Sequence, residues 1–334
     1  MNAPIKTVEE LGSVVTAAGV HAFSPIAIAV ENLHRNFGNF KALSGISFEV
    51  PRGHVFGFIG PNGAGKTTTM RILSTLDLPT SGNGFIDGFS VVDDPEFVRS
   101  RLGFMPDAFG TYRDISCVEY LDFFARASRL TGRTREDRLD WVLRFTGTDS
   151  MSDKPIDGLS KGMKQRLCLG RAMIHDPAVL VLDEPAAGLD PRARIELRQM
   201  IRELADNGKT VLISSHILTE LAEICDSVAI IERGELLAVG SVEELNRKQT
   251  STRRVSVKVN GSADAAKEVL RSLESVTKLE TNETQLDFDF AGDLDDQADL
   301  IEHLVRHGVR VVEVHSHRQS LEDLFLEVTK GLVQ

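Results

Sequence analysis

A glycine-rich segment that ends in a lysine and two threonines has the residue types and spacing that bind a nucleoside triphosphate. The segment consists of Gly60, Pro61, Asn62, Gly63, Ala64, Gly65, Lys66, Thr67 and Thr68. Glycines allow left-handed backbone, so several N–H groups can converge on one anion at the start of a helix. Lys66 is predicted to reach the β- and γ-phosphates, Thr67 to complete the coordination of Mg²⁺, and Thr68 to contact phosphate. A turn that only joins a strand to a helix is the alternative interpretation.

Two adjacent carboxylates, Asp183 and Glu184, follow the apolar run Val179 to Leu182. Side chains alternate along an extended chain, so these two carboxylates can point in different directions. One would hold Mg²⁺ and the next would orient or deprotonate an attacking water. The pattern therefore predicts Asp183 as a metal ligand and Glu184 as a catalytic base, with a solvated acidic pair at a strand end as the alternative.

A second candidate anion site precedes the helical segment Lys164 to Met173. Ser160 is well placed as the N-cap of this helix. Together with Gly162, the helix N-terminus can also hold a γ-phosphate. Because one chain then offers two phosphate-binding elements for one ligand, the sequence predicts a head-to-tail homodimer around two nucleotides.

The elements that must position these residues follow an α/β pattern. Between residues 26 and 246, short apolar runs alternate with helical patterns, which predicts a parallel or mixed sheet covered by helices. An insert at about 115–175 has helical periodicity and is expected to form a helical subdomain. The expected buried strands are 55–59, 179–182, 211–214 and 228–231.

The two ends of the chain are expected to differ from this nucleotide-binding domain. Residues 1–25 are interpreted as a flexible leader, because glycines, serines and Pro25 interrupt their apolar stretch. A polar stretch at 247–253 is a natural linker. Residues 254–334 show the order β-α-β-β-α-β-α, including a last helix at 321–328, and predict a small α+β accessory domain of ferredoxin-like fold.

Length and charge limit the possible partners. A chain of 334 residues is long enough for two domains, and its net charge of -11, with a pI near 5.4, argues against a nucleic-acid surface. The three cysteines, Cys117, Cys168 and Cys225, are widely spaced and form no C-x-x-C pair. They suit a reducing cytoplasm and are expected to be packed or exposed thiols.

Taken in order, the motifs resemble those of the ATP-binding-cassette ATPases. The matching segments are the phosphate loop, Leu159 to Met163, Asp183 with Glu184, Gly188 to Asp190, and Ser214 to His216. The resemblance implies that Phe37 stacks on adenine, that Asp190 joins two active sites across a dimer, and that His216 contacts the γ-phosphate. Core packing for Phe37, an N-cap for Asp190 and a hydrogen-bonded strand end for His216 are the alternatives.

The sequence departs from the family pattern at two places. Asp107 stands where the family usually has a glutamine that contacts Mg²⁺ and senses the transmembrane partner. In the signature segment, Lys161 replaces the first of two glycines and Met163 replaces a glutamine. These changes exchange charge at the site, so we predict that Asp107 of one subunit and Lys161 of the other compensate in the same composite site.

The resemblance narrows to ATPase subunits of exporters whose membrane domain is a separate polypeptide. It implies that ATP and Mg²⁺ bind, that Lys66 offsets developing charge and that Glu184 aligns the water. It also implies a cytoplasmic subunit, peripheral on the inner membrane face through a transmembrane permease that exports a drug, antibiotic, lipid or polysaccharide. A non-transport ATPase of the same family and a regulatory nucleotide-binding module are the alternative functions.

Overall fold

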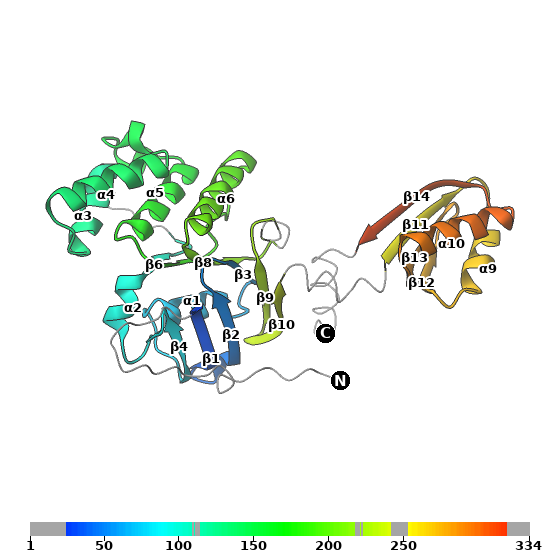
Figure 1. Cartoon of the computed structure of the whole chain (residues 1–334), viewed down its shortest axis with the longest axis horizontal. Coiled ribbons are helices and arrows are strands. Elements are labelled where there is room, and N and C mark those ends of the chain that lie inside the picture. The colour runs from blue at the N-terminus through cyan, green and yellow to red at the C-terminus, as the bar shows by residue number, and fades with distance from the viewer. Residues whose placement is uncertain are drawn as a thin grey trace.

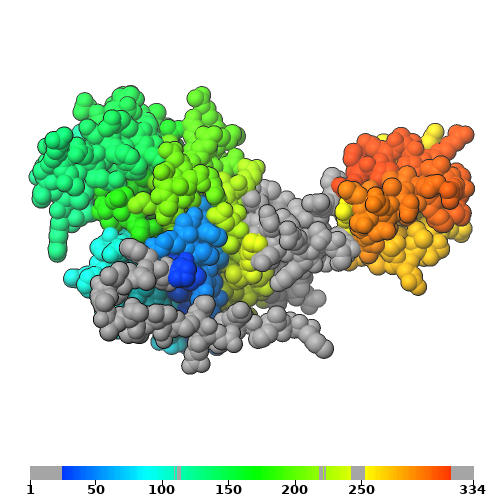
Figure 2. All heavy atoms as spheres, in the orientation of Figure 1, coloured from blue at the N-terminus to red at the C-terminus, as the bar shows by residue number. Residues whose placement is uncertain are grey.

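The computed structural model describes residues 25–108, 110, 114–217, 221, 223–241 and 253–318. The described residues form one larger unit up to residue 241 and a smaller one from residue 253 (Figures 1 and 2). The expected leader, the linker and the last helix lie outside the described residues, apart from residues 25 and 253. None of the described helices has both the length and the apolar character that crossing a bilayer demands.

A six-stranded sheet forms the centre of the first unit. Its strand order is β10-β9-β3-β8-β7-β6; β9, β3, β8, β7 and β6 run parallel, and β10 pairs antiparallel with β9. The strands are β3 (Val55–Ile59), β6 (Leu102–Met105), β7 (Val179–Leu182), β8 (Thr210–Ser215), β9 (Ser227–Glu232) and β10 (Glu235–Ser241). The structure thus confirms the four expected strands, each to within one residue at either end.

Alternating side chains of the central strands pack against different layers. Phe56 and Phe58 of β3 belong to a core shared with α1 (Lys66–Leu73) and with a second sheet. Val55 and Ile59 point the other way, into a core shared with α6 (Pro191–Asp206). Both faces of the sheet are therefore covered, which explains why β3, β7 and β8 are buried along their whole length.

The second sheet of the first unit is antiparallel, with the strand order β2-β1-β4-β5. Its strands are β1 (Ile26–Phe37), β2 (Phe40–Pro51), β4 (Ser81–Ile86) and β5 (Phe89–Ser90), and α2 (Pro95–Arg101) follows it. The expected alternation of strands with helices is wrong for this part of the chain. β1 and β2 are joined by a hairpin turn of only two residues, in which Gly38 has φ 59°, so no helix can intervene.

The insert between β6 and β7 is helical, as expected, and Figure 1 shows its helices gathered on one side of the central sheet. They are α3 (Cys117–Ala127), α4 (Gly132–Phe145) and α5 (Lys161–Met173). Tyr120, Val142 and Leu167 lie in a core that these helices share. α5 also places Cys168 and Leu169 in the core that the central sheet shares with α6. This packing attaches the insert to the strands that carry the site.

The second unit has the ferredoxin-like arrangement that its pattern predicts. Four antiparallel strands lie in the order β12-β13-β11-β14. Its elements are β11 (Arg253–Val259), α9 (Asp264–Arg271), β12 (Val276–Thr281), β13 (Gln285–Phe290), α10 (Leu294–Arg306) and β14 (Val311–Arg318). Leu270 and Leu304, one from each helix, pack with Val257 and Phe288 of the strands, so both helices contribute to one core.

All three cysteines are buried, which favours packed over exposed thiols. Burial raises the pKa of Cys168 to about 11, and it also raises the pKa values of Cys117 and Cys225. Because the thiolate is the reactive form, the folded chain should react very slowly with a thiol-specific disulfide reagent at neutral pH. Spectrophotometric titration should detect three thiols only after denaturation; a fast-reacting thiol in the folded chain would contradict this expectation.

Candidate active site

The phosphate loop joins the end of β3 to the start of α1 and uses backbone that suits glycine. Gly65, the N-cap of α1, has φ 112°, a left-handed conformation that other residues rarely adopt. A Cβ atom on Gly60 would lie 2.2 Å from the carbonyl oxygen of Ile231, so a side chain does not fit there. Of the other loop residues, Pro61, Asn62, Gly63 and Thr67 are exposed, Thr68 is half-buried and Ala64 is buried. The predicted strand, glycine loop and helix are all present.

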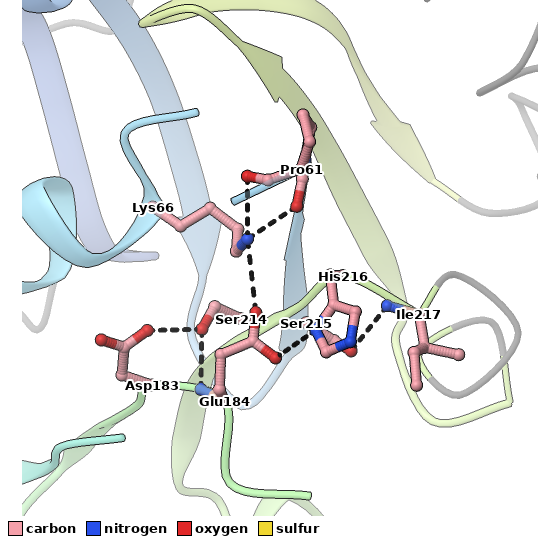
Figure 3. Close-up of polar contacts among 9 residues, drawn as sticks. Pro61, Lys66, Asp183, Glu184, Ser214, Ser215, His216 and Ile217 are labelled. Carbon is pink, nitrogen blue, oxygen red and sulfur yellow. Dashed lines mark hydrogen bonds and ion pairs between the residues drawn. The ribbon is translucent and has the colours of Figure 1, made fainter. Parts of the chain in front are cut away.

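Lys66 is buried at the first turn of α1, with 5% of its side chain exposed. Its Nζ donates to the carbonyl oxygens of Gly60 (2.6 Å) and Pro61 (3.3 Å) and lies 3.3 Å from Glu184 Oε1 (Figure 3). A buried ammonium group is costly unless hydrogen bonds and opposite charge surround it. The loop carbonyls and the carboxylate supply both, and they hold a positive charge where the phosphates of a nucleotide are expected.

Asp183 and Glu184 leave β7 in different directions, and Ser214 of the neighbouring strand β8 connects them. Ser214 Oγ donates to Asp183 Oδ1 (2.7 Å) and accepts the backbone N–H of Glu184 (2.8 Å), as Figure 3 shows. Asp183 is 1% exposed, whereas the side chain of Glu184 points towards Lys66 and His216. Glu184 has φ 47°, so the chain takes a left-handed turn between the two carboxylates.

The residues expected to hold Mg²⁺ converge on Asp183. Burial raises the pKa of Asp183, and the charges of Asp107 and Glu184 raise it further, whereas hydrogen bonds with Ser214 and Thr67 lower it. A carboxyl group with a raised pKa keeps its proton to a higher pH, so acidification would release a metal from it sooner than from an ordinary aspartate.

This donor set fits Mg²⁺ in the presence of a nucleotide. Among the described residues, no group of three acidic, histidine or cysteine side chains forms a ready-made metal site. Mg²⁺ characteristically takes one or two carboxylates and fills its remaining positions with phosphate oxygens and water. The hydroxyl of Thr67 and the carboxylates of Asp107 and Asp183 therefore match what this ion needs.

His216 lies beside Glu184 at the end of β8. Its Nδ1 is 2.8 Å from Glu184 Oε2, and 47% of the histidine side chain is exposed. The backbone N–H of Ile217 donates to Ser215 Oγ (2.9 Å), which holds the turn that carries the imidazole. The structure thus brings all three expected catalytic residues, Lys66, Glu184 and His216, into one row of polar contacts (Figure 3).

The second expected anion element stands at the start of α5, where Ser160 Oγ accepts the N–H of Met163 (3.3 Å). Asp190 caps α6 in the same way by accepting the N–H of Ala193 (3.0 Å). A Cβ atom on Gly162 would lie 3.3 Å from Ala193 Cβ, so the two helix starts pack together. No hydrogen bond within the described part of the chain joins Ser160, Gly162 or Asp190 to the phosphate loop. One chain therefore presents the two elements separately.

The two unusual charged residues occupy different places. Asp107 acts electrostatically on Asp183, within the expected metal site. The side chain of Lys161 lies across the loop before α6. Its Nζ is so close to Gly188 that a Cβ atom on that glycine would lie only 2.3 Å away. Gly188 also has φ 67°, so this position favours glycine for two reasons. Compensation between Asp107 and Lys161 of different chains stays a prediction.

Two features of the site were not expected from the sequence. In the sequence, Ser214 is only part of a motif; its role between the two carboxylates follows from its place near the end of β8, which pairs parallel with β7. Phe37, expected to stack on adenine, ends β1 with 47% of its surface exposed. The guanidinium carbon of Arg35 lies 4.5 Å from the centroid of the Phe37 ring, and nothing in the sequence pointed to that contact.

Both units of the chain are similar to known protein families. The family model described as "ABC transporter" matches residues 43–187, and one described as the C-terminal domain of DrrA1-3-like ATP-binding proteins matches residues 240–329. The daunorubicin resistance ATP-binding protein DrrA3 of Streptomyces coeruleorubidus is 32% identical over 91% of this chain and 96% of its own length. The linearmycin resistance ATP-binding protein LnrL of Bacillus subtilis is 29% identical over 90% and 98%.

Solved structures match the first unit. One described as the ATP-binding subunit of an ABC transporter is 31% identical, with a TM-score of 0.61, over 66% of this chain and 92% of its own. A dimeric ATP-binding cassette in a post-hydrolysis state, bound to ADP and phosphate, has a TM-score of 0.59 at 23% identity, over 64% of this chain and 98% of its own. The second of these likenesses shows the fold alone.

Proposed function

The chain belongs to the family of ABC transporter ATP-binding proteins, and from this premise we propose that it hydrolyses ATP to drive export through a separate membrane subunit. The observation that carries the proposal is the row of contacts from Lys66 through Glu184 to His216, beside the Ser214 bridge to Asp183. These residues supply a cation for phosphate, a carboxylate for water and a second carboxylate for a metal. This arrangement supports hydrolysis rather than nucleotide sensing as the proposed function.

In the proposed reaction, water attacks the γ-phosphorus, a new P–O bond forms and the bond to the bridging oxygen of ADP breaks. Glu184 orients the water and accepts its proton, while Lys66 lies against the β- and γ-phosphates. His216, held by Glu184, contacts the γ-phosphate. When bound through Thr67, Asp107 and Asp183, Mg²⁺ would supply charge neutralisation between the phosphates.

The complete site is proposed to need a second copy of the chain. Ser160 and Gly162 at the start of α5, together with Asp190 at the start of α6, would close on the nucleotide held by the partner's phosphate loop. Helix N-termini favour anions, and these two are packed side by side as one surface. ATP would then join the two chains, and hydrolysis would release them.

The proposed partner is a transmembrane permease, and the proposed location is the cytoplasmic face of the cell membrane. The names of the relatives support export: two refer to resistance against daunorubicin and linearmycin. A third relative, the Nod factor export ATP-binding protein I of Ralstonia nicotianae, is 37% identical over 65% of this chain and 68% of its own length. Purification of the tagged chain from detergent-solubilised membranes should recover one polytopic membrane protein in stoichiometric amount, and its repeated absence would contradict the proposal.

If Asp107 and Lys161 of two chains compensate each other, their substitutions should not be additive. We expect Asp107→Gln and Lys161→Gly each to lower the ATPase rate, and the double variant to be less impaired than the sum predicts, by about 0.5–3 kcal/mol of coupling. Steady-state phosphate release would measure the three rates. Lys164→Gly is the matched control, because it removes a lysine from the first turns of the same helix. Purely additive losses would reject the coupling.

A further inference from the structure

Arg35 covers one face of the Phe37 ring. The two residues are two positions apart on β1, and their side chains are in contact although the pairing of β1 with β2 shifts register between Arg35 and Asn36. The Arg35 guanidinium carbon is 4.5 Å from the ring centroid, well within the range of a cation–π contact. Phe37 still has 47% of its surface exposed, so the aromatic ring remains accessible to a ligand.

The guanidinium group is fixed by an acidic residue that follows the helix of the phosphate loop. Arg35 Nη2 donates to Asp77 Oδ1 (2.7 Å), and the exposed fractions of the two side chains are only 22% and 19%. Asp77 Oδ1 also accepts the backbone N–H of Leu78 (2.9 Å), so the carboxylate is itself held. Arg35 Nε is buried and has no hydrogen-bond partner among the described residues. The ring and Asp77 are therefore what position this cation.

The backbone at this end of β1 is tied to the same segment. The N–H of Asn36 donates to Thr80 Oγ1 (2.9 Å), and the N–H of Thr80 donates to the carbonyl oxygen of His34 (2.8 Å). These bonds flank the Arg35 to Asp77 pair on both sides. The strand end that carries Phe37 is thus joined by side chains and backbone to residues 77–80, a few positions after the end of α1.

We propose that Arg35, held by Asp77, is a positioning and specificity-determining residue for the nucleobase, acting through Phe37. The inference rests on the proposed function as an ATPase, together with the expectation from the family resemblance that Phe37 stacks on the base. Arg35 occupies one face of the ring and so leaves the other face as the place for a base. The resulting order is base, phenyl ring, guanidinium, carboxylate.

This order makes the ring a better platform in two ways. The cation draws the π electrons of the ring towards itself, so the opposite face is less repulsive to an electron-rich purine. It also restricts the rotation of a half-exposed side chain, which lowers the ordering cost of binding. Purines have more surface to stack than pyrimidines, so Arg35 is expected to favour ATP and GTP over CTP and UTP.

The experiment compares ligands that have a base with one that has none. Isothermal titration calorimetry of the full chain with ATP, CTP and inorganic tripolyphosphate would give the dissociation constants. Arg35→Ala should weaken ATP binding ~2- to 5-fold and CTP binding less, and it should leave tripolyphosphate unchanged. Asp77→Asn should act in the same direction, and Arg35→Lys, which keeps the charge but loses the planar group, should retain part of the affinity for ATP.

A double substitution tests whether Arg35 acts through the ring. Phe37→Ala should weaken ATP binding by about 5- to 100-fold, and adding Arg35→Ala to it should cause no further loss. Arg138→Ala is the matched control, because Arg138 makes the same two kinds of contact in the helical insert. Its guanidinium carbon lies 4.5 Å from the centroid of the Trp141 ring, and its Nη2 lies 3.4 Å from Asp176 Oδ1. That variant should bind all three ligands like the parent chain, and thermal denaturation would verify the folding of every variant.

Two results would overturn the inference alone: equal losses for ATP and tripolyphosphate in Arg35→Ala, or an additional loss in the double variant. Either would show that Arg35 and Asp77 only hold β1 against the segment after α1. Failure of the unsubstituted chain to bind both ATP and tripolyphosphate would instead overturn the proposed function, and the inference with it.

Discussion

Replacing Glu184 with glutamine should abolish ATP hydrolysis and preserve ATP binding. The amide has almost the same shape as the carboxylate but cannot accept the proton of the attacking water. Loss of a positioned general base typically lowers a rate by about 10²- to 10⁴-fold. The same change removes a negative charge 3.3 Å from Lys66 Nζ, so the lysine becomes more available to phosphate and ATP should bind at least as tightly as before.

Because bound ATP is no longer cleaved, Glu184→Gln should also accumulate as an ATP-joined dimer. Phosphate release would measure the rate, and size-exclusion chromatography with ATP and Mg²⁺ would measure the dimer. Glu49→Gln, a substitution of an exposed glutamate on β2, is the matched control and should behave like the parent chain. Normal hydrolysis by Glu184→Gln would show that another group accepts the proton.

Replacing Lys66 with alanine should weaken nucleotide binding itself. The ammonium group is the buried cation of the phosphate loop, and hydrogen bonds that involve a charged group contribute about 1.5–3 kcal/mol each. Losing one such interaction raises the dissociation constant for ATP about 10- to 100-fold. The substitution also leaves Glu184, whose side chain is 14% exposed, without its buried cation next to the incoming γ-phosphate.

Calorimetric titration with ATP and with ADP separates the two contributions of Lys66. The affinity for ATP should fall more than that for ADP, because ADP has no γ-phosphate to be repelled by Glu184. Lys41→Ala, which removes an exposed lysine from β2, should leave both affinities unchanged. Unaltered ATP affinity in Lys66→Ala would contradict the role of the loop as the phosphate site.

The central sheet could be predicted because its strands are continuous apolar runs. Val55 to Ile59 and Val179 to Leu182 are buried on both faces, and such strands need no partner information to be recognised. The antiparallel sheet was harder to predict. β1 and β2 each have twelve residues with a mixed burial pattern, and their pairing shifts register at several points, which hides the alternation.

The site residues likewise include some that the sequence predicts and some whose contacts only the fold reveals. Lys66, Asp183 and Glu184 could be predicted because each lies in a short contiguous motif beside a strand. The bridge from Ser214 to Asp183 depends instead on the register between β7 and β8, whose residues are far apart in the chain. The contact between Arg35 and Asp77 likewise joins positions 42 residues apart, so only the fold reveals it.

The hydrogen bonds from Lys66 to the carbonyl oxygens of Gly60 and Pro61 should affect how fast nucleotides bind and leave the phosphate loop. An arriving nucleotide does not meet a bare cation; it must take the place of bonds that the loop already makes. The affinity for nucleotide should therefore be lower than the charge of Lys66 alone would give. When a nucleotide leaves, Lys66 can form its hydrogen bonds to the loop carbonyls again. In the proposed hydrolysis cycle the site must be emptied after every turnover, and these bonds of Lys66 would assist that step.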